Sequence, residues 1–294
     1  MRITVFTPTY NRAYIIENLY NSLKKQTFKD FEWIVVDDGS NDNTEELFSR
    51  INDENKSFAI NYIKTENGGK HRAINRGIKC AKGELFYIVD SDDFLPDNAL
   101  EIIDKVEKTL SEEEKHKFAG VCGVKAFVGN NIIGSTFEGD YLDITQLQRP
   151  KYGITGDKAE VFYTELLKKY PFPEFENEKF ITECVVWDKI AFDGYKLRFF
   201  NESVMICEYR DDGLSAQSSN LFHKNPKGYG LYLYQSGKYG KLFGVNKWNE
   251  YLKFYYEFRN EYSFNQIAEF LKHSPIALWI RLFGLRIFYK LYDR

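Results

Sequence analysis

The sequence has few cysteines and no long apolar run, and these absences exclude several classes of protein. Its cysteines, Cys80, Cys122, Cys184 and Cys207, lie far apart and form no C-x-x-C pair. This spacing argues against a zinc site and is typical of free thiols in a reducing cytosol. No apolar run is long enough to cross a bilayer, and residues 1–7 open directly into a predicted strand without a signal peptide. We therefore expect a cytoplasmic protein.

Two common nucleotide-binding loops and a strong net charge are also missing. The chain contains neither G-x-G-x-x-G after its first predicted strand nor G-x-x-x-x-G-K-[ST] anywhere. A formal net charge of −3 gives no support for a nucleic-acid partner. At 294 residues, the chain is long enough for one large or two small domains with a sizeable core.

Predicted strands and helices alternate in the first third of the chain. The predicted strands are residues 2–7, 31–36, 58–63 and 85–89, and the predicted helices are residues 14–26, 45–50 and 73–81. This alternation predicts an α/β fold with a single, mostly parallel sheet flanked by helices. Because parallel strands end at one edge, we expect Thr7–Tyr10, Asp37–Ser40, Asn67–Arg72 and Asp90–Asp93 to line one cleft.

The predicted strand 85–89 runs straight into three carboxylates, those of Asp90, Asp92 and Asp93. Burying carboxylates is costly, but at a strand end they face the crevice where such sheets bind ligands. Two aspartates one residue apart can share a hard cation such as magnesium or manganese. The alternative is an acidic turn before the helix that starts near Pro96.

Four motifs in residues 1–100 resemble, in order and spacing, those of family 2 glycosyltransferases, which have the GT-A fold. The motifs are Thr7-Pro8-Thr9-Tyr10-Asn11-Arg12, Val35-Val36-Asp37-Asp38-Gly39-Ser40, Asn67-Gly68-Gly69 with Asn75 and Gly77, and Val89-Asp90-Ser91-Asp92-Asp93. The resemblance implies a nucleotide-diphosphate-sugar donor, with UDP the commonest nucleotide. It also implies a divalent cation, Mn or Mg, and inversion at the sugar carbon.

The resemblance also assigns roles to single residues. It places Pro8, Tyr10 and Asp38 in the nucleoside site, with Asp38 accepting a hydrogen bond from the base. Asp90 would face the ribose and the metal, and Asp92 would be the principal metal ligand. The other residues implied to bind the nucleotide sugar are Thr7, Arg12, Asn67, Lys70 and Ser91.

One departure from the family pattern concerns a positive charge. Many members have an arginine directly before the asparagine that matches Asn75, and here that position is Ile74. Lys70, His71 or Arg72 would have to replace it, and we favour Lys70.

The segment before Trp187 resembles the place where family members carry an acidic pair and then a helix. Counting back four residues gives Glu183, with Thr182 in place of the first acid. An acceptor hydroxyl must lose its proton as it attacks, so the reaction needs a base, and the resemblance implies Glu183. Glu178 and Asp188 are the alternative bases. Glu183 could instead be an acidic residue at a helix N-terminus.

The middle of the chain is predicted to form a hairpin of strands 118–128 and 131–135, then a helix that ends at Lys169. Three stretches resemble enzymes of bacterial capsule and cell-surface polysaccharide synthesis. They are residues 156–161, 180–183 and 208–215. This resemblance places Asp157 and Trp187 near the acceptor. It places His223 on a mobile loop that reaches the diphosphate, although a plain surface histidine is the alternative.

Residues 229–294 are expected to be helical, with a last helix that starts at Ser274 and Pro275. The stretch 275–292 is aromatic and aliphatic with basic residues, so it could lie in a membrane interface at the inner face of the cell membrane. The alternatives are a helix packed on the domain or a dimer contact.

The predicted domains are a nucleotide-sugar half (1–115), an acceptor half (116–215) and a helical C-terminal extension (216–294). The predicted function is transfer of a sugar to a glycan or lipid-linked acceptor. One rival is a sugar-1-phosphate nucleotidyltransferase, which needs a glycine-rich N-terminal loop that residues 7–12 lack. The other is a binding protein without turnover, against which the retained acids Asp90, Asp92 and Glu183 argue.

Overall fold

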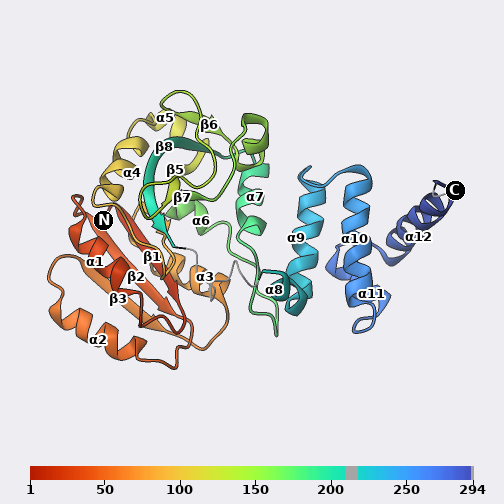
Figure 1. The fold of residues 1–294 in the computed structure, drawn as a ribbon, viewed down its shortest axis with the longest axis horizontal. Coiled ribbons are helices and arrows are strands. Elements are labelled where there is room, and N and C mark those ends of the chain that lie inside the picture. The colour runs from red at the N-terminus through yellow and green to blue at the C-terminus, as the bar shows by residue number, and fades with distance from the viewer. Residues whose placement is uncertain (209–217, 293–294) are drawn as a thin grey trace. The chain divides into compact units, whose positions relative to one another are not determined.

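The computed structural model describes residues 1–208 and 218–292, and these divide into two compact units (Figure 1). The sheet unit comprises the described residues within Met1–Phe172 and Ile190–Asp211. The helical unit comprises those within Pro173–Lys189 and Asp212–Arg294. Of the predicted polysaccharide-enzyme stretch 208–215, residues 209–215 lie outside the described part of the chain.

The elements alternate as predicted up to β4 and continue with a mixed second half. In chain order they are β1 (Ile3–Thr9), α1 (Glu17–Lys25), β2 (Phe31–Asp37), α2 (Thr44–Glu54), β3 (Ala59–Lys64), α3 (Lys70–Cys80), β4 (Leu85–Ile88), α4 (Ala99–Glu107), α5 (Glu112–Lys115), β5 (Phe118–Phe127), β6 (Leu142–Ile144), the 3-10 helix η1 (Gln146–Tyr152), β7 (Lys158–Tyr163), α6 (Thr164–Leu167), α7 (Cys184–Phe192), β8 (Lys196–Cys207), α8 (Ser218–Lys224), α9 (Pro226–Lys238), α10 (Gly244–Phe258), α11 (Phe264–Phe270) and α12 (Pro275–Tyr292).

The strands form one eight-stranded sheet in the order β3-β2-β1-β4-β7-β5-β8-β6. Strand β1 pairs in parallel with β2 and β4, β2 pairs in parallel with β3, and β5 pairs in parallel with β8. Strand β7 is antiparallel to both of its neighbours, and β6 is antiparallel to β8. The prediction of a single, mostly parallel sheet is confirmed.

Helices cover both faces of the sheet, as the alternation of elements predicts. On one face, side chains of α1, α2 and α4 share a core with alternate strand residues such as Val5, Trp33 and Tyr87. On the other face, α3 packs on β1 and β2. Its Gly77 makes this approach possible, because an added Cβ would lie 2.2 Å from the ring of Phe6.

The helix predicted to end at Lys169 is present but short, because only Thr164–Leu167 are helical. The residues before it, Lys158–Tyr163, form the strand β7, which was not predicted. Strand β7 lies between β4 and β5, which satisfy its backbone groups on both sides. Pairing in the middle of a sheet overrides the weak local preference of this segment.

The predicted hairpin partner, residues 131–135, is reduced to a single bridge between Ala126 and Ile132. The ammonium of Lys158 donates to the carbonyl oxygens of Ile133 (3.1 Å) and Ser135 (3.0 Å). In a hairpin, these two carbonyl groups would accept hydrogen bonds from a neighbouring strand. Here they accept them from the buried Lys158 instead.

The helical unit has its own core, formed by α9 to α12. Its fully buried members include Tyr251, Phe254 and Phe258 of α10. The last helix begins as predicted, because Pro275 is its first residue and the Ser274 hydroxyl accepts from the amide of Ala277 at 3.2 Å.

Candidate functional site

Hydrogen bonds join the carboxyl ends of the first parallel strands. The amide of Asp38 donates to the carbonyl of Thr9 at 2.8 Å, and the amide of Val89 donates to that of Phe6 at 2.9 Å. The amide of Thr65, after β3, donates to Asp37 at 2.8 Å. The polar segments that follow β1 to β4 therefore start from one edge of the sheet, where ligands bind in such folds.

The carboxylate of Asp38 holds the glycine loop at this edge. One oxygen accepts from the amide of Gly68 (2.7 Å), and the other accepts from the amide of Gly69 (2.8 Å) and the side chain of Asn67 (3.1 Å). Gly39 lets the loop come this close, since its φ is +81° and an added Cβ would lie 2.8 Å from the Asn67 nitrogen. These three bonds give the buried Asp38 carboxylate a structural role, and its predicted bond to a base stays a prediction.

Helix α3 begins at Lys70, three residues before its predicted start, so all three candidate cations lie in its first turn. The Lys70 ammonium is 2.7 Å from Oδ1 of Asp90 and 2.9 Å from Oδ2. His71 is 1 % exposed, and Arg72 donates to the carbonyl of Gly68 at 2.5 Å. Lys70 thus forms an ion pair with Asp90 of the acidic turn.

The acidic segment after β4 is a turn fixed at both ends. The amide of Asp93 donates to the carbonyl of Asp90 at 3.1 Å. The next residue, Phe94, exchanges two backbone hydrogen bonds of 3.0 and 2.8 Å with Ile206 of β8. Ser91 is buried within the turn, whereas Asp92 is partly exposed.

The carboxylates of the turn have different pKa values because their neighbours differ. Burial raises the pKa of Asp90, but Lys70 and Lys125 outweigh it and the pKa is lowered. Burial and the charge of Asp90 raise the pKa of Asp92. The same two causes raise the pKa of Asp93 to about 7.

The turn fits a divalent cation. No three His, Cys, Asp or Glu side chains of the described residues are grouped to hold a metal ion. Magnesium, however, is usually bound through one or two carboxylates together with substrate phosphates. Asp92 meets this need, because its carboxylate is partly exposed. The negative charge of Asp90 disfavours ionisation of Asp92, and a bound cation would offset that repulsion.

Other residues of the predicted nucleotide site have contrasting surroundings. The hydroxyl of Thr7 is buried and accepts from the indole of Trp33 at 3.0 Å. Pro8 lies within β1, beyond Phe6, where pairing with β4 ends, so its missing N–H is tolerated. Tyr10 is 46 % exposed and able to meet a planar base. The positive charge of Arg12 acts on the carboxylates of both Asp90 and Asp92.

Sequence reasoning missed Lys125 of β5 and Glu160 of β7. Burial lowers the pKa of Lys125, but the nearby carboxyl groups of Asp90, Asp93 and Glu160 outweigh it and the pKa is raised. Its ammonium has no hydrogen bond or ion pair with a residue that the structure describes. A charged residue inside an otherwise apolar strand was the one available signal.

Glu183 lies in the helical unit, immediately before α7, and its carbonyl accepts from the amides of Val186 and Trp187, each at 3.0 Å. The two alternative bases have structural partners. Glu178 is buried and accepts from the amides of Lys227 (2.7 Å) and Gly228 (2.8 Å) at the start of α9.

The other alternative base, Asp188, is buried and 2.7 Å from the ammonium of Lys241. With Glu178 at a helix start and Asp188 in an ion pair, both carboxylates have identifiable structural roles. The assignment of Glu183 as the base stays a prediction from the sequence.

The residues predicted to meet the acceptor or diphosphate differ in exposure. Asp157 is exposed just before β7, and Trp187 is 9 % exposed on α7. His223 lies on α8, which corrects the predicted loop, and its Nδ1 is 2.9 Å from Glu257 of α10. The ring also stacks on Phe258, with the centroids 5.5 Å apart.

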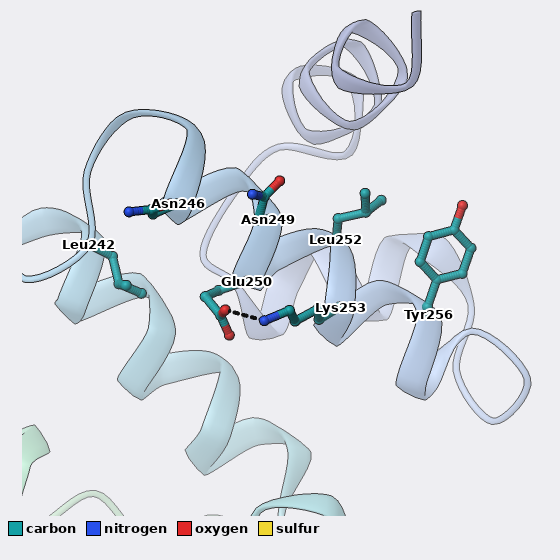
Figure 2. Close-up of a pocket in the computed structure, with 7 residues that line it drawn as sticks. All are labelled: Leu242, Asn246, Asn249, Glu250, Leu252, Lys253 and Tyr256. Carbon is teal, nitrogen blue, oxygen red and sulfur yellow. Dashed lines mark hydrogen bonds and ion pairs between the residues drawn. The ribbon is translucent and has the colours of Figure 1, made fainter. Parts of the chain in front are cut away.

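A pocket of about 550 Å³ lies along α10 in the helical unit (Figure 2). It is lined by Leu242, Asn246, Asn249, Glu250, Leu252, Lys253 and Tyr256. An ion pair of 2.7 Å joins two of these lining residues, Glu250 and Lys253. None of these residues belongs to the site predicted from the sequence, and all but Leu242 come from one helix.

Comparison with known proteins agrees with this arrangement. The family model "Glycosyl transferase family 2" matches residues 4–131. Glycosyltransferase GlyG of Streptococcus pneumoniae is 37 % identical over 237 residues, which is 74 % of each chain. Poly(ribitol-phosphate) beta-N-acetylglucosaminyltransferase TarS of Staphylococcus aureus is 31 % identical over 178 residues, 59 % of this chain but 30 % of TarS.

Solved structures show the same fold. A crystal structure of S. aureus TarS in complex with UDP superposes with a TM-score of 0.59 and 21 % identity, covering 90 % of this chain and 73 % of that one. The Pyrobaculum calidifontis mannosyltransferase in complex with GDP-Man and Mn²⁺ gives a TM-score of 0.53 at 22 % identity, covering 80 % and 64 %. The predicted GT-A fold is thus confirmed, and the chain belongs to the family 2 glycosyltransferases.

Proposed function

We propose that the protein transfers a sugar from a nucleotide-diphosphate sugar to a hydroxyl group of a glycan or lipid-linked acceptor in bacterial surface polysaccharide synthesis. The observation that carries the proposal is the acidic turn Asp90–Asp93 at the edge where the Asp38 loop and Lys70 also lie. A UDP-sugar is the proposed donor. This choice is supported by the TarS crystal structures, which were obtained with UDP and with UDP-GlcNAc.

The donor site is proposed to use residues of the sheet unit. Tyr10 would stack on the base, and Asp38 would accept from it. Lys70 would face the diphosphate from the first turn of α3, where the helix N-terminus also favours anions. Pro8, Thr7, Arg12, Asn67 and Ser91 complete the proposed nucleotide-sugar site.

Manganese or magnesium is the proposed cofactor, held by Asp92 with a share from Asp90. When bound, such a cation supplies positive charge that stabilises the leaving diphosphate. The Mn²⁺ in the mannosyltransferase structure supports this choice. Asp93, with its raised pKa, would orient the turn through its buried carboxyl group.

Glu183 is the proposed catalytic base. It would take the proton from the acceptor hydroxyl as that oxygen forms a bond to the anomeric carbon and the bond to the diphosphate oxygen breaks. The products are the glycoside, a nucleoside diphosphate and a protonated Glu183. One carboxylate on the side opposite the leaving group suffices for such a displacement, which inverts the sugar carbon.

The remaining sequence predictions concern the acceptor and the domains. Residues 1–115 would form the donor half and 116–215 the acceptor half, followed by the extension 216–294. Asp157 and Trp187 would lie near the acceptor, and His223 would contact the diphosphate. Lipid-linked acceptors are held at a membrane, and a contact through 275–292 would bring the enzyme to them.

A thermal-shift screen tests the proposal. Binding to the native state raises the melting temperature by mass action, so UDP-, GDP- and dTDP-sugars are compared with manganese present and absent. We expect one UDP-sugar to give the largest rise and manganese to increase it. No rise with any nucleotide sugar would contradict the proposal. A rise with a nucleoside triphosphate and a sugar phosphate together would favour a nucleotidyltransferase.

A further inference from the structure

Helix α12 leaves an apolar side open to solvent. Ile276, Trp279 and Ile280 are spaced three and four residues apart, so they lie on one side of the helix. They are 75, 54 and 58 % exposed. Leu278 and Leu282 are buried in the core that α12 shares with the other helices of this unit. The helix is therefore anchored by one side and displays another.

The exposed apolar residues of α12 form a group, which is unusual on a soluble protein. Single exposed apolar side chains are normal on soluble proteins, but a contiguous group that includes a tryptophan marks an interaction surface. No helix in the described ranges 1–208 and 218–292 is long and apolar enough to cross a membrane. A surface contact, with the helix lying along its partner, is the geometry that the exposed side allows.

The charge of the helix identifies the kind of surface. Its 18 residues include Arg281, Arg286 and Lys290 but no Asp or Glu, in a chain whose net charge is −3. Lys272, just before the helix, is exposed. Arg281 is exposed as well, and its guanidinium lies over the ring of Trp248, 4.6 Å from the centroid. Anionic headgroups attract such basic segments, and tryptophan favours the membrane interface.

We propose that α12 binds an anionic lipid surface, with its axis along the surface and Ile276, Trp279 and Ile280 inserted among the headgroups. The purpose of this contact rests on the proposed function, because it would hold the enzyme beside a lipid-linked acceptor. The binding itself requires no catalysis. A second copy of the chain is a poorer partner, since two such basic helices repel each other whereas an anionic surface attracts them.

Vesicle binding by the full chain tests the proposal. Trp33 is fully buried, Trp187 is 9 % exposed and Trp248 is covered by Arg281, so Trp279 is the tryptophan placed to sense a lipid surface. With phosphatidylglycerol vesicles we expect co-sedimentation and a blue shift of the tryptophan emission. Phosphatidylcholine vesicles should bind at least about tenfold more weakly. The variant Trp279→Phe should still co-sediment with the vesicles but should show no blue shift of the tryptophan emission.

Point substitutions are preferable to removal of the helix, which would also take Leu278 and Leu282 out of the core. The double variant Ile276→Glu/Ile280→Glu should bind the anionic vesicles at least about tenfold more weakly. Val128→Glu, an equivalent change at a 59 % exposed residue of the sheet unit, should bind like the unaltered protein. Circular dichroism and UDP binding check that each variant is folded and keeps its donor site.

Two results would overturn the proposal. One is that the double variant binds anionic vesicles as tightly as the unaltered protein does, or that the unaltered protein binds neutral vesicles as tightly as anionic ones. The other is an unaltered protein that ignores vesicles but forms a dimer in sedimentation velocity, which the double variant lacks. Loss of UDP binding in the unaltered protein would instead contradict the proposed function and leave vesicle binding to be judged by itself.

Discussion

The ammonium of Lys70 lies 2.7 Å from a carboxylate oxygen of Asp90, which joins the first turn of α3 to the acidic turn after β4. Ile74 stands where the family resemblance implies an arginine, and Lys70 brings a positive charge to the predicted donor site. Because the pair is partly exposed, its chief effect is expected on ligand binding rather than on stability.

Replacing this lysine should weaken nucleotide binding. Lys70→Met removes a charge-assisted contact with the diphosphate, so we expect ~10- to 100-fold weaker UDP binding in calorimetry. Lys79→Met alters an exposed lysine in the last turn of the same helix and should bind UDP normally. Equal affinities for the two variants would remove Lys70 from the donor site.

Glu183→Gln should separate binding from turnover. The amide cannot accept the acceptor's proton, so kcat should fall ~10²- to 10⁴-fold while donor affinity stays unchanged. Radiolabelled sugar transfer measures the first quantity, and calorimetry measures the second. Turnover at the original rate would assign the base to another residue.

Glu178→Gln is the matched comparison. The carboxylate of Glu178 accepts hydrogen bonds from two backbone amides at the start of α9. The substitution should therefore lower the free energy of unfolding by roughly 1 to 2 kcal/mol. The folded fraction should keep most of its turnover. A large loss of kcat in folded Glu178→Gln would make Glu178 a candidate base again.

Lys125→Met should destabilise the sheet unit. Burial lowers the pKa of Lys125, but the carboxylates of the acidic turn outweigh it, so the charged form of Lys125 is favoured in the folded state. Removing the charge leaves the carboxylates of Asp90 and Asp93 less compensated, and we expect a loss of roughly 1 to 3 kcal/mol in urea unfolding. Lys125→Arg should recover most of that loss, and an unchanged midpoint for Lys125→Met would contradict this account.

The helical unit should lose stability in mild acid because of His273. Burial, with the nearby charges of Lys247 and Arg281, lowers the pKa of this imidazole below 6.5. The unfolded chain then binds the proton more readily, so the stabilising contribution is complete above pH 6.5 and is lost as the pH falls through the folded pKa. We expect the free energy of unfolding, measured with urea, to be lower at pH 5 than at pH 7. His273→Gln should flatten this dependence, and an equally steep dependence in that variant would assign it to other groups.

Strand ends were predictable because they follow buried apolar runs. The four segments after β1 to β4 meet at one edge because parallel pairing leaves no other arrangement, and Asp38 and Asp90 are found there. The first turn of α3 was harder to predict. Its basic residues read as a loop after the glycines, yet Gly69 precedes the helix with a φ of +97°.

The second half was less predictable, since its structure depends on distant partners. Strand β7 forms where β4 and β5 pair with it on both sides, which nothing in its own six residues specifies. The carbonyls of Ile133 and Ser135 bind the distant Lys158, which local turn rules cannot anticipate. Likewise, Lys125 meets the acidic turn through the packing of β5 and β8, whereas a single lysine forms no motif.

Calorimetric titration of UDP with and without manganese, on the unaltered protein, Asp92→Ala and Asp97→Ala, tests the central claim most directly. Asp97 is an exposed acid five residues beyond Asp92 and serves as the control. We predict that manganese tightens UDP binding to the unaltered protein and to Asp97→Ala, and that Asp92→Ala loses this increase. Equal tightening in all three proteins, or none in the unaltered one, would contradict the assignment of the acidic turn as a metal-assisted nucleotide-sugar site.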